Sequence, residues 1–302
     1  FNNDSVVYHL GYRGGIFSDN VLEADLLEAE RLIDRIECDL VHFHTMGIFE
    51  FKLAQSINTP YVYTYHTPSW TCRRGDLLYA GDHKNICQGR VGIDACSNCL
   101  IKTKLKNKLR SNNYIINITS KVLYFSLLLV DHKSIVEQEK FTKHLSLFLT
   151  MSSCGIFPAL WCENLLELNG ASKDKLVHIP QGVSKTFSLS TRFNQERREV
   201  FKVLYYGRVA KEKGIEDFIE LITSNEDNNI EFGICGFKSI PPDDDYEKEI
   251  FGRSETYGVE LIEFVNEEKI NRIMDDYDAI IIPSKCMETG PMTFFEARRK
   301  GL

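Results

Sequence analysis

Residues 279–297, which read AIIIPSKCMETGPMTFFEA, give the clearest indication of the architecture. A short apolar run, Ala279 to Ile282, leads into a Gly-Pro turn, and a helix is expected to begin at about Met292. An apolar run without alternating polar residues is typical of a strand that is buried on both faces. A strand that leads through a loop into a helix is the unit from which parallel sheets are built.

The same order of strand, loop and helix recurs along the chain in two series. The first series has predicted strands at residues 39–44, 61–65, 147–151 and 177–179. The second has predicted strands at residues 202–206, 231–235, 260–264 and 279–282. Residues 184–200, between the two series, are polar and charged, as expected of a domain boundary. We therefore predict an α/β protein with one domain at residues 1–190 and a second at residues 191–302.

Three helices can be predicted from apolar spacing and end signals. Residues 214–224 carry apolar side chains at the i, i+3, i+4, i+7 spacing of a stripe that packs on a sheet. Residues 156–168 are apolar and end at an Asn-Gly pair, which is a helix stop signal. Asn266 is followed by two glutamates, and is expected to cap a helix whose dipole favours negative charge in the first turn.

Length and composition exclude several classes of protein. The 302 residues are 43% hydrophobic and 26% charged, as in globular domains rather than disordered, collagenous or disulfide-dense chains. The formal net charge of −7 gives no general attraction for nucleic acid, so none is expected as a partner. No apolar run approaches the ~20 residues that span a bilayer, and the start does not resemble a signal peptide. The nine cysteines are an odd number and fit a reducing compartment, so a cytoplasmic protein is expected.

Two carboxylates eight positions apart, Glu288 and Glu296, are the first candidates for a functional site. Glu288 lies in the loop after the strand predicted at 279–282, and ligands bind outside the carboxyl ends of parallel strands. The N–H groups of Met292 and Thr293 at the helix start favour a phosphate. Glu296, one turn later, could accept hydrogen bonds from a ribose. The alternative is a solvated charge pair at an ordinary helix start, and spacing alone does not exclude it.

A second loop, at residues 207–214, also joins a strand to a helix. Gly207 permits a close backbone approach, while Arg208 and Lys213 place two cations in the loop. Arginine binds phosphate oxygens through two parallel N–H groups, and lysine acts as a point charge. The alternative for this loop, taken alone, is a basic stretch on the protein surface.

Together the two loops resemble glycosyltransferase family 4, whose members are retaining enzymes with two Rossmann-like domains facing a cleft, the GT-B type. The family's Gly-Arg…Lys-Gly loop is matched by residues 207–214, and its Glu-x7-Glu motif by Glu288 and Glu296. Three further segments resemble family motifs: residues 39–44 (DLVHFH), 65–68 (YHTP) and 179–183 (IPQGV). In the last of these, Gln181 replaces the usual asparagine.

The resemblance implies a role for each matched residue. Arg208 and Lys213 would bind the diphosphate of a nucleotide-sugar donor and stabilise the charge on the leaving group, so that catalysis requires no metal cofactor. Glu288 would contact the donor sugar and Glu296 the ribose. His66, from the opposite domain, would reach the sugar or its phosphate; without the family, a histidine satisfied at a strand end is the simpler interpretation. Further donor contacts would come from Gly207, Gly290, Pro291, Met292 and Thr293.

The resemblance also implies the substrates. A sugar would move from a UDP- or GDP-linked donor to a saccharide or lipid-linked acceptor, in surface polysaccharide or glycolipid biosynthesis. Family members carry a strand and a glycine-rich loop before the segment matched by residues 39–44, and a strand and helix beyond the segment matched by 288–302. We therefore expect a sequence that lacks both ends of the family fold, with the second domain incomplete. The alternative is an inactive nucleotide-sugar-binding protein or fragment. Nicotinamide-dependent and P-loop enzymes are disfavoured because G-x-G-x-x-G and G-x4-G-K-[S/T] are absent.

Cys72, Cys87, Cys96 and Cys99 gather in a loop-like insertion at residues 70–100. The last two form a C-x2-C unit, whose thiolates can point at one metal ion, and four thiolates would complete a tetrahedral zinc site. The first two have no such short spacing, so reduced cysteines that pack the loop are an equal alternative. Any zinc here would be structural, because four thiolates leave no open position.

Residues 102–143 are locally cationic, with nine basic side chains against three acidic ones, and contain an apolar run at 122–130. A basic stretch beside exposed apolar side chains could dock on anionic lipid, which would make the protein peripheral at the inner face of the membrane. The alternative is a solvated helix followed by a core helix at 122–130, which the first domain needs for its core.

Overall fold

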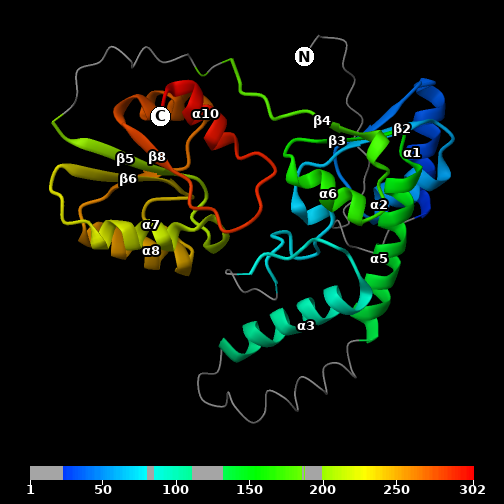
Figure 1. The fold of residues 1–302 in the computed structure, drawn as a ribbon, viewed down its shortest axis with the longest axis horizontal. Coiled ribbons are helices and arrows are strands. Elements are labelled where there is room, and N and C mark those ends of the chain that lie inside the picture. Colours follow the sequence, from blue (N-terminus) through cyan, green and yellow to red (C-terminus); the bar gives the residue numbers. More distant parts are fainter. Residues whose placement is uncertain (1–22, 80–84, 111–131, 186, 188–198) are drawn as a thin grey trace. The chain divides into compact units, whose positions relative to one another are not determined.

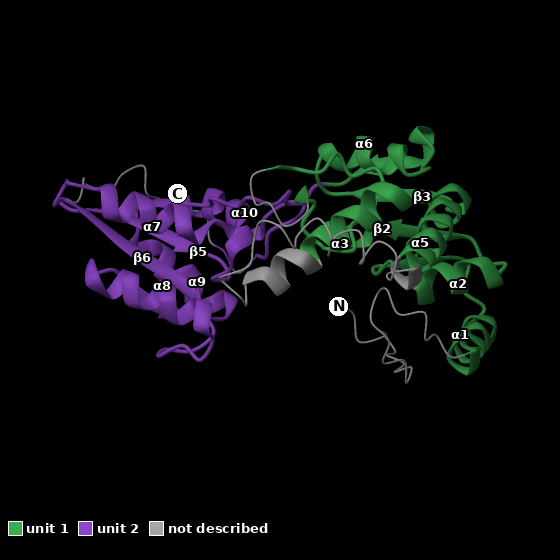
Figure 2. Cartoon of the chain, turned by 90° about the horizontal axis from the view of Figure 1, so that it is seen from below, with its two compact units in different colours: residues 1–179 green, residues 180–302 purple. Residues whose placement is uncertain are grey.

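The computed structural model describes residues 23–79, 85–110, 132–185, 187 and 199–302. By its internal contacts the chain divides into two compact units, Phe1–Ile179 (unit 1) and Pro180–Leu302 (unit 2), which Figure 2 shows in different colours. The boundary predicted between residues 190 and 191 lies in the segment 188–198, outside the described residues. The division into units falls before that segment.

Unit 1 contains a four-stranded parallel sheet in the order β1-β2-β3-β4 (Figure 1). Its strands are β1 (Val41–Phe43), β2 (Tyr61–Thr64), β3 (Cys154–Phe157) and β4 (Leu176–His178). Its helices are α1 (Glu23–Ile36), α2 (Ile48–Ser56), α3 (Ile93–Arg110), α5 (His132–Met151) and α6 (Trp161–Leu168). Short 3-10 turns lie at Pro68–Trp70 and Lys173–Lys175. An aromatic cluster joins α2, α5 and β2, because the ring of Phe148 lies 5.1 Å from that of Phe51 and 5.0 Å from that of Tyr61.

Unit 2 contains a second four-stranded parallel sheet, in the order β7-β6-β5-β8. Its strands are β5 (Phe201–Tyr206), β6 (Ile230–Phe237), β7 (Glu260–Glu263) and β8 (Ala279–Ile281). Its helices are α7 (Ile215–Ser224), α8 (Asp245–Thr256), α9 (Glu267–Ile273) and α10 (Met292–Lys300), with 3-10 turns at Lys211–Lys213 and Met274–Asp276.

The sheet of unit 2 is buried on both faces, as its continuous apolar runs predict. Val203 and Tyr205 of β5 belong to one core cluster together with the apolar stripe of α7. Leu204, which points to the opposite face, packs in a second cluster with Ile270 of α9 and Met274. Because successive residues of a strand point to opposite faces, helices on both sides are needed to bury this sequence.

Seven of the eight predicted strands overlap strands of the structure. The prediction of a strand at residues 147–151 is wrong, since these residues form the last turns of α5. Phe141, Leu145, Phe148 and Leu149 are all buried, and their positions i, i+4, i+7 and i+8 are those of a helical stripe. A five-residue window contains too little of this stripe to distinguish it from a buried strand.

The helix predicted at residues 156–168 begins later, at Trp161, because Ile156 and Phe157 belong to β3. Gly155 in β3 lies against the ring of Tyr63, where a Cβ would come within 2.3 Å of the phenol oxygen. The other two predicted helices are confirmed as α7 and α9, and the side chain of Asn266 caps α9. The core helix predicted at 122–130 lies outside the described residues.

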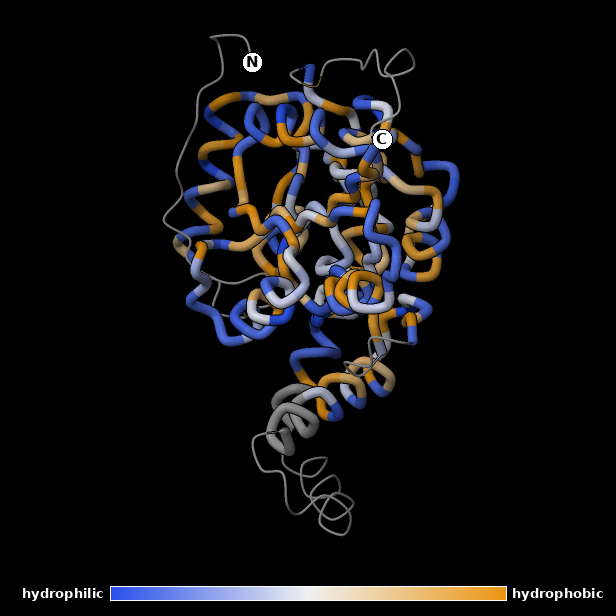
Figure 3. Tube along the Cα trace, turned by 90° about the vertical axis from the view of Figure 1, so that its left-hand side faces the viewer, coloured by the Kyte–Doolittle hydropathy of each residue, from blue (hydrophilic) through white to orange (hydrophobic). Residues whose placement is uncertain are grey.

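Figure 3 shows hydrophobic and hydrophilic residues alternating along the turns of the helices. Within the part of the chain that the structure describes, no helix combines the length and the apolar character needed to cross a membrane. The helices instead bury one apolar side against the sheets, as the stripe of α7 does.

Candidate functional site

The order of strands in unit 2 creates a topological switch point at the carboxyl ends of β5 and β8. The chain runs from β5 outward to β6 and β7, and then returns to add β8 on the other side of β5. Ligands of open α/β sheets bind at such points, outside the carboxyl ends of the strands. The two loops singled out in the sequence, 207–214 and 282–291, follow β5 and β8 respectively.

Backbone contacts hold these two loops together. The carbonyl oxygen of Glu212 accepts hydrogen bonds from the N–H groups of Lys285 (2.9 Å) and Cys286 (3.3 Å). Gly214 has a φ of 70°, and a Cβ at this position would lie 1.9 Å from the carbonyl oxygen of Pro283. Position 214 therefore requires a residue that lacks a Cβ and tolerates left-handed φ, and glycine has both properties.

Lys213 and Glu288 form an ion pair between the loops. The Nζ atom of Lys213 lies 2.5 Å from Oε1 of Glu288, which also accepts a hydrogen bond of 2.8 Å from the hydroxyl of Ser284. Both side chains of the pair are 24% exposed, so neither charge is fully removed from water. The structure thus brings into contact two residues, 75 positions apart, that the sequence assigned to one site.

Arg208 follows the carboxyl end of β5 and is largely exposed. Its Nη2 atom donates to Oε1 of Glu212 at 3.2 Å, and 66% of its side chain is accessible to solvent. Surface ion pairs of this kind contribute about 0–1 kcal/mol, so the guanidinium can exchange Glu212 for another anion at little cost.

Gly236, near the end of β6, is a residue that the sequence did not single out. A Cβ at this position would lie 1.8 Å from the carbonyl oxygen of Gly207, so the ends of β5 and β6 approach each other closely. Gly207 and Gly236 are 29 positions apart, so no local pattern in the sequence predicts this approach. Gly207 and Gly236 together shape the start of the loop that carries Arg208.

A cavity of about 610 Å³ lies beside Arg208 in unit 2 and was not predicted. Its lining combines the loops after β5, β6 and β7, and includes the rings of Tyr246 and Phe264. The Nζ atom of Lys211 lies 4.9 Å from the centre of the Tyr246 ring. The cavity therefore offers aromatic faces next to the switch point, together with both basic and acidic side chains.

Glu296 lies one turn into α10 and is 9% exposed. Its Oε2 atom is buried without a hydrogen-bond partner among the described residues. Burial, and to a smaller extent Glu267, raises the pKa of this carboxyl group. A buried oxygen that lacks a donor is costly unless a ligand supplies one.

The amino end of α10 has no side-chain cap, and Pro291 precedes its first residue, Met292. Gly290 has a φ of 123° and lies against Gln181, whose Cγ would be 2.8 Å from an added Cβ. Thr293 follows in the first turn. The segment 179–183 and the loop before α10, which the sequence linked only through the family resemblance, therefore meet in unit 2 at Gln181 and Gly290.

His66 belongs to unit 1, where it follows β2. Its Nε2 atom lies 3.0 Å from Nδ1 of His44, which follows β1, and the two rings are stacked at 5.3 Å. His42 lies next to His44, with ring centres 4.0 Å apart. Burial, and then the imidazole of His44, lowers the pKa of His66, which favours the neutral ring. The sequence did not predict that His44 contacts His66, because the two residues lie on different strands.

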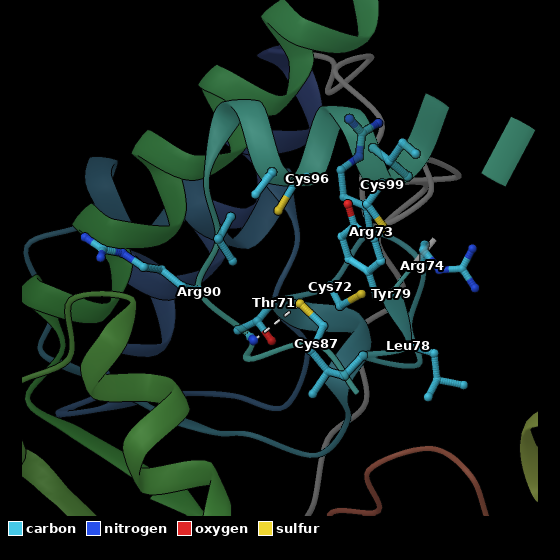
Figure 4. A pocket seen from close by; sticks show the side chains of 15 residues that line it. Thr71, Cys72, Arg73, Arg74, Leu78, Tyr79, Cys87, Arg90, Cys96 and Cys99 are labelled. Carbon is cyan, nitrogen blue, oxygen red and sulfur yellow. Dashed lines mark hydrogen bonds between the residues drawn. The ribbon is translucent and has the colours of Figure 1, made fainter. Parts of the chain in front are cut away.

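The four clustered cysteines, Cys72, Cys87, Cys96 and Cys99, line one small cavity of unit 1 (Figure 4). All four are free thiols. Among the described residues, no group of three or more His, Cys, Asp or Glu side chains already has the arrangement of a metal site. The zinc site expected from the sequence therefore stays a prediction.

Comparison with known proteins bears on unit 2 in particular. Residues 189–302 match the family model of glycosyl transferases group 1. This range contains both loops at the switch point and all of α10. No curated protein is significantly similar to the sequence.

Similar solved structures cover both units. HepE from Anabaena, in complex with UDP, is 14% identical with a TM-score of 0.58, over 92% of this chain and 61% of that one. Sucrose-phosphate synthase from Thermosynechococcus elongatus is 16% identical with a TM-score of 0.56, over 91% and 57% of the two chains. A glycosyltransferase from Rickettsia africae is 15% identical with a TM-score of 0.55, over 94% and 62%. At such identities the likeness shows the fold alone, and it confirms two Rossmann-like α/β domains of the GT-B type. The chain spans about three fifths of the length of these proteins.

Proposed function

We propose that this chain is the donor-binding and catalytic part of a retaining glycosyltransferase of family 4, which moves a sugar from a nucleotide diphosphate donor to an acceptor. The observation that carries the proposal is the Lys213–Glu288 pair at the switch point of unit 2. In this pair Lys213 would be the cation for the leaving phosphate, and Glu288 would be the carboxylate for the sugar. The match of residues 189–302 to glycosyl transferases group 1 supports the same assignment.

The cations would act on the leaving group. The exposed Arg208 would exchange its partner Glu212 for a diphosphate oxygen, while Lys213 would turn from Glu288 to the phosphate next to the sugar. Positive charge at this point stabilises the negative charge that develops as the bond between the sugar and the phosphate breaks. Two cations and the amino end of α10 supply that charge from the protein itself, so we expect no metal requirement.

The remaining donor contacts would come from α10 and the adjacent cavity. The partnerless Oε2 atom of Glu296 accepts a ribose hydroxyl, and its raised pKa falls once a hydroxyl donates to the ionised form. The loop from Gly290 to Thr293 presents backbone N–H groups to the diphosphate. The base would occupy the cavity of about 610 Å³, where Phe264 offers an aromatic face.

The retaining route would be a front-face displacement. The bond from the anomeric carbon to the phosphate oxygen breaks, and the acceptor oxygen bonds to the same face. The acceptor's proton passes to the departing phosphate, so no carboxylate nucleophile is required. The acceptor is proposed to be a saccharide or a lipid-linked saccharide of surface polysaccharide or glycolipid assembly at the inner face of the membrane. Docking through residues 102–143 stays a prediction, because 111–131 are outside the described residues.

A donor panel tests this function. The product of the complete reading frame is mixed with UDP- and GDP-sugars, and binding is measured by calorimetry while transfer and hydrolysis are followed by release of the nucleotide. Binding of one nucleotide class together with turnover supports the transferase. Binding without turnover for any donor and acceptor supports the alternative, an inactive nucleotide-sugar-binding protein. Absence of binding contradicts both assignments.

His44 is proposed as a positioning residue for His66, which would contact the donor sugar or its phosphate in the neutral form. Because His44 lowers the pKa of His66, the variant His44→Asn should let that pKa rise toward its ordinary value. If activity requires neutral His66, the variant would then lose activity at a higher pH than the wild type as the solution is acidified. We expect the acidic limb of kcat/KM to move to higher pH, and kcat to fall about 10-fold through lost positioning.

The matched control is His144→Asn, because His144 lies on α5 and contacts Gln55 (3.1 Å) rather than His66. This variant should keep the wild-type pH profile. A loss of activity in His44→Asn with an unmoved acidic limb would indicate a merely structural role for His44.

A further inference from the structure

Four cysteines from three separate segments of unit 1 meet around one small cavity. Cys72 follows the turn at Pro68–Trp70, Cys87 follows the bridge between Leu78 and Ile86, and the other two belong to the first turns of α3. Figure 4 shows the sulfur atoms of Cys96 and Cys99 directed from α3 toward the loop that carries Cys72 and Cys87. The cavity between them measures about 60 Å³, which is far too small for a nucleotide and sufficient for a metal ion.

Backbone N–H groups already point at two of the sulfurs. The N–H of Gly89 donates to Sγ of Cys87 at 3.4 Å, and the N–H of Gly92 donates to Sγ of Cys96 at 3.5 Å. Hydrogen bonds of this kind orient the side chains of metal ligands, so these two N–H groups would help to hold the sulfurs toward a bound ion. The position of Cys96 in the first turns of α3 adds the favourable dipole of a helix amino end.

The segment between the cysteines is held in place by the buried side chain of Asn169, which the sequence marked only as part of a helix stop signal. The amide of Asn169 donates to the carbonyl oxygen of Gly89 at 2.9 Å and accepts from the N–H of Val91 at 2.8 Å. Asn169 is 8% exposed and follows α6. These bonds fix the chain between Cys87 and Cys96, so that part of the ordering needed to bring these sulfurs together is already supplied by the fold.

We propose that Cys72, Cys87, Cys96 and Cys99 bind one structural zinc ion as four thiolates. Zinc prefers a tetrahedral set of sulfur ligands at about 2.3 Å, and four cysteines leave it no open position for chemistry. Binding converts four thiols and one Zn²⁺ into a complex of charge −2 and releases four protons to the buffer. Arg73 and Arg74 line the same cavity, but their charges are already paired with Glu137 (3.1 Å) and Asp76 (2.7 Å), so they offset little of that charge.

Zinc binding must draw the sulfurs together, since no metal-site arrangement already exists among the described residues. A C-x2-C pair on a helix needs only side-chain rotation, because residues three apart share a face. Zinc binding would stabilise this loop locally. Among the described residues between 71 and 92, the only strand pairing is the bridge of Leu78 with Ile86. A cross-link of this loop to α3 stabilises a region with little regular structure of its own.

Metal content and cobalt spectroscopy test the site. The complete protein is purified under reducing conditions, and we expect one zinc per chain by elemental analysis. Replacement of the zinc by Co²⁺ should give the intense visible bands and the sulfur-to-metal charge transfer of a tetrahedral four-thiolate site. Cys72→Ser and Cys99→Ser should each weaken zinc binding by at least about 100-fold.

The matched control is Cys38→Ser, because Cys38 is a free cysteine of unit 1 that does not line the cavity. It should retain one zinc and the wild-type cobalt spectrum. The cobalt spectrum of the unaltered protein decides the question even if the serine variants fail to fold. A folded, reduced wild-type protein that takes up no zinc overturns the proposal. So does a disulfide between these cysteines that survives purification under reducing conditions, an iron–sulfur absorption spectrum, or unchanged zinc in both serine variants.

Discussion

Replacement of Lys213 by alanine is expected to lower the rate of sugar transfer by about 100- to 1000-fold. The variant removes the cation that pairs with Glu288 at 2.5 Å and that would stabilise the departing phosphate. Since the charge on the phosphate is greatest in the transition state, kcat should fall more than the affinity for the donor. Steady-state kinetics of the complete protein, with the donor that the nucleotide panel selects, give both quantities.

Lys202→Ala is the matched control, because Lys202 lies near the start of β5, away from the switch point, where its ammonium group pairs with Glu231 at 2.9 Å. It should change kcat by only a few-fold. Glu288→Ala is expected to reduce activity as well. The double variant should lose less than the two single losses combined, because the two side chains act as a contacting pair. Unchanged rates in both Lys213→Ala and Glu288→Ala would remove the basis of the role assignments.

Much of the fold follows from sequence because its strands are buried on both faces. The segments that form β5 and β8 are apolar at successive positions, and this pattern can be recognised from the sequence alone. The error at residues 147–151 has the opposite cause. The helical stripe there begins at Phe141, and a short window cut from a fully buried helix has the same composition as a strand. Strand β3 was not predicted from the sequence. It contains Gly155, which is required there by the ring of Tyr63 on β2, and a sequence pattern does not reveal such a contact.

The candidate site could be predicted only where one loop contains its own signal. Within each loop, the spacing of the charged residues can be recognised from the sequence: cations in residues 207–214 and carboxylates in residues 288–296. Their meeting at Lys213 and Glu288 depends on strand order, since β8 returns to pair with β5. The contact of His44 with His66 likewise depends on the neighbouring strands β1 and β2. Such contacts are determined by which strands are neighbours in the sheet, and no local spacing of residues in the sequence predicts them.

Gly214→Ala is expected to disturb the switch point strongly through a single added methyl group. The new Cβ would lie 1.9 Å from the carbonyl oxygen of Pro283, and the backbone there has a φ of 70°. Left-handed backbone costs a non-glycine residue about 1–2 kcal/mol, and a methyl group forced into a packed contact costs about 1–3 kcal/mol more. We therefore expect the free energy of unfolding of unit 2 to fall by about 2–5 kcal/mol.

The measurement uses hydrogen exchange of the amides of β5 and β8, which reports on unit 2 alone. Both tryptophans, Trp70 and Trp161, belong to unit 1, so their fluorescence during denaturation serves as an internal reference. Gly252→Ala is the matched control. Gly252 lies in α8 with nothing within 4 Å of an added Cβ, and alanine should stabilise unit 2 by about 0.5–1 kcal/mol.

The activity of Gly214→Ala separates stability from site geometry. Relief of the clash requires residue 214 and Pro283 to move apart, and we expect this movement to lengthen the contact between Lys213 and Glu288. We expect transfer to fall about 100-fold even at temperatures where the variant is fully folded, because a displacement of about 1 Å at reacting groups has an effect of this size. Full activity in the folded variant would show that the two loops do not need each other, and that the pairing of Lys213 with Glu288 is incidental to the chemistry.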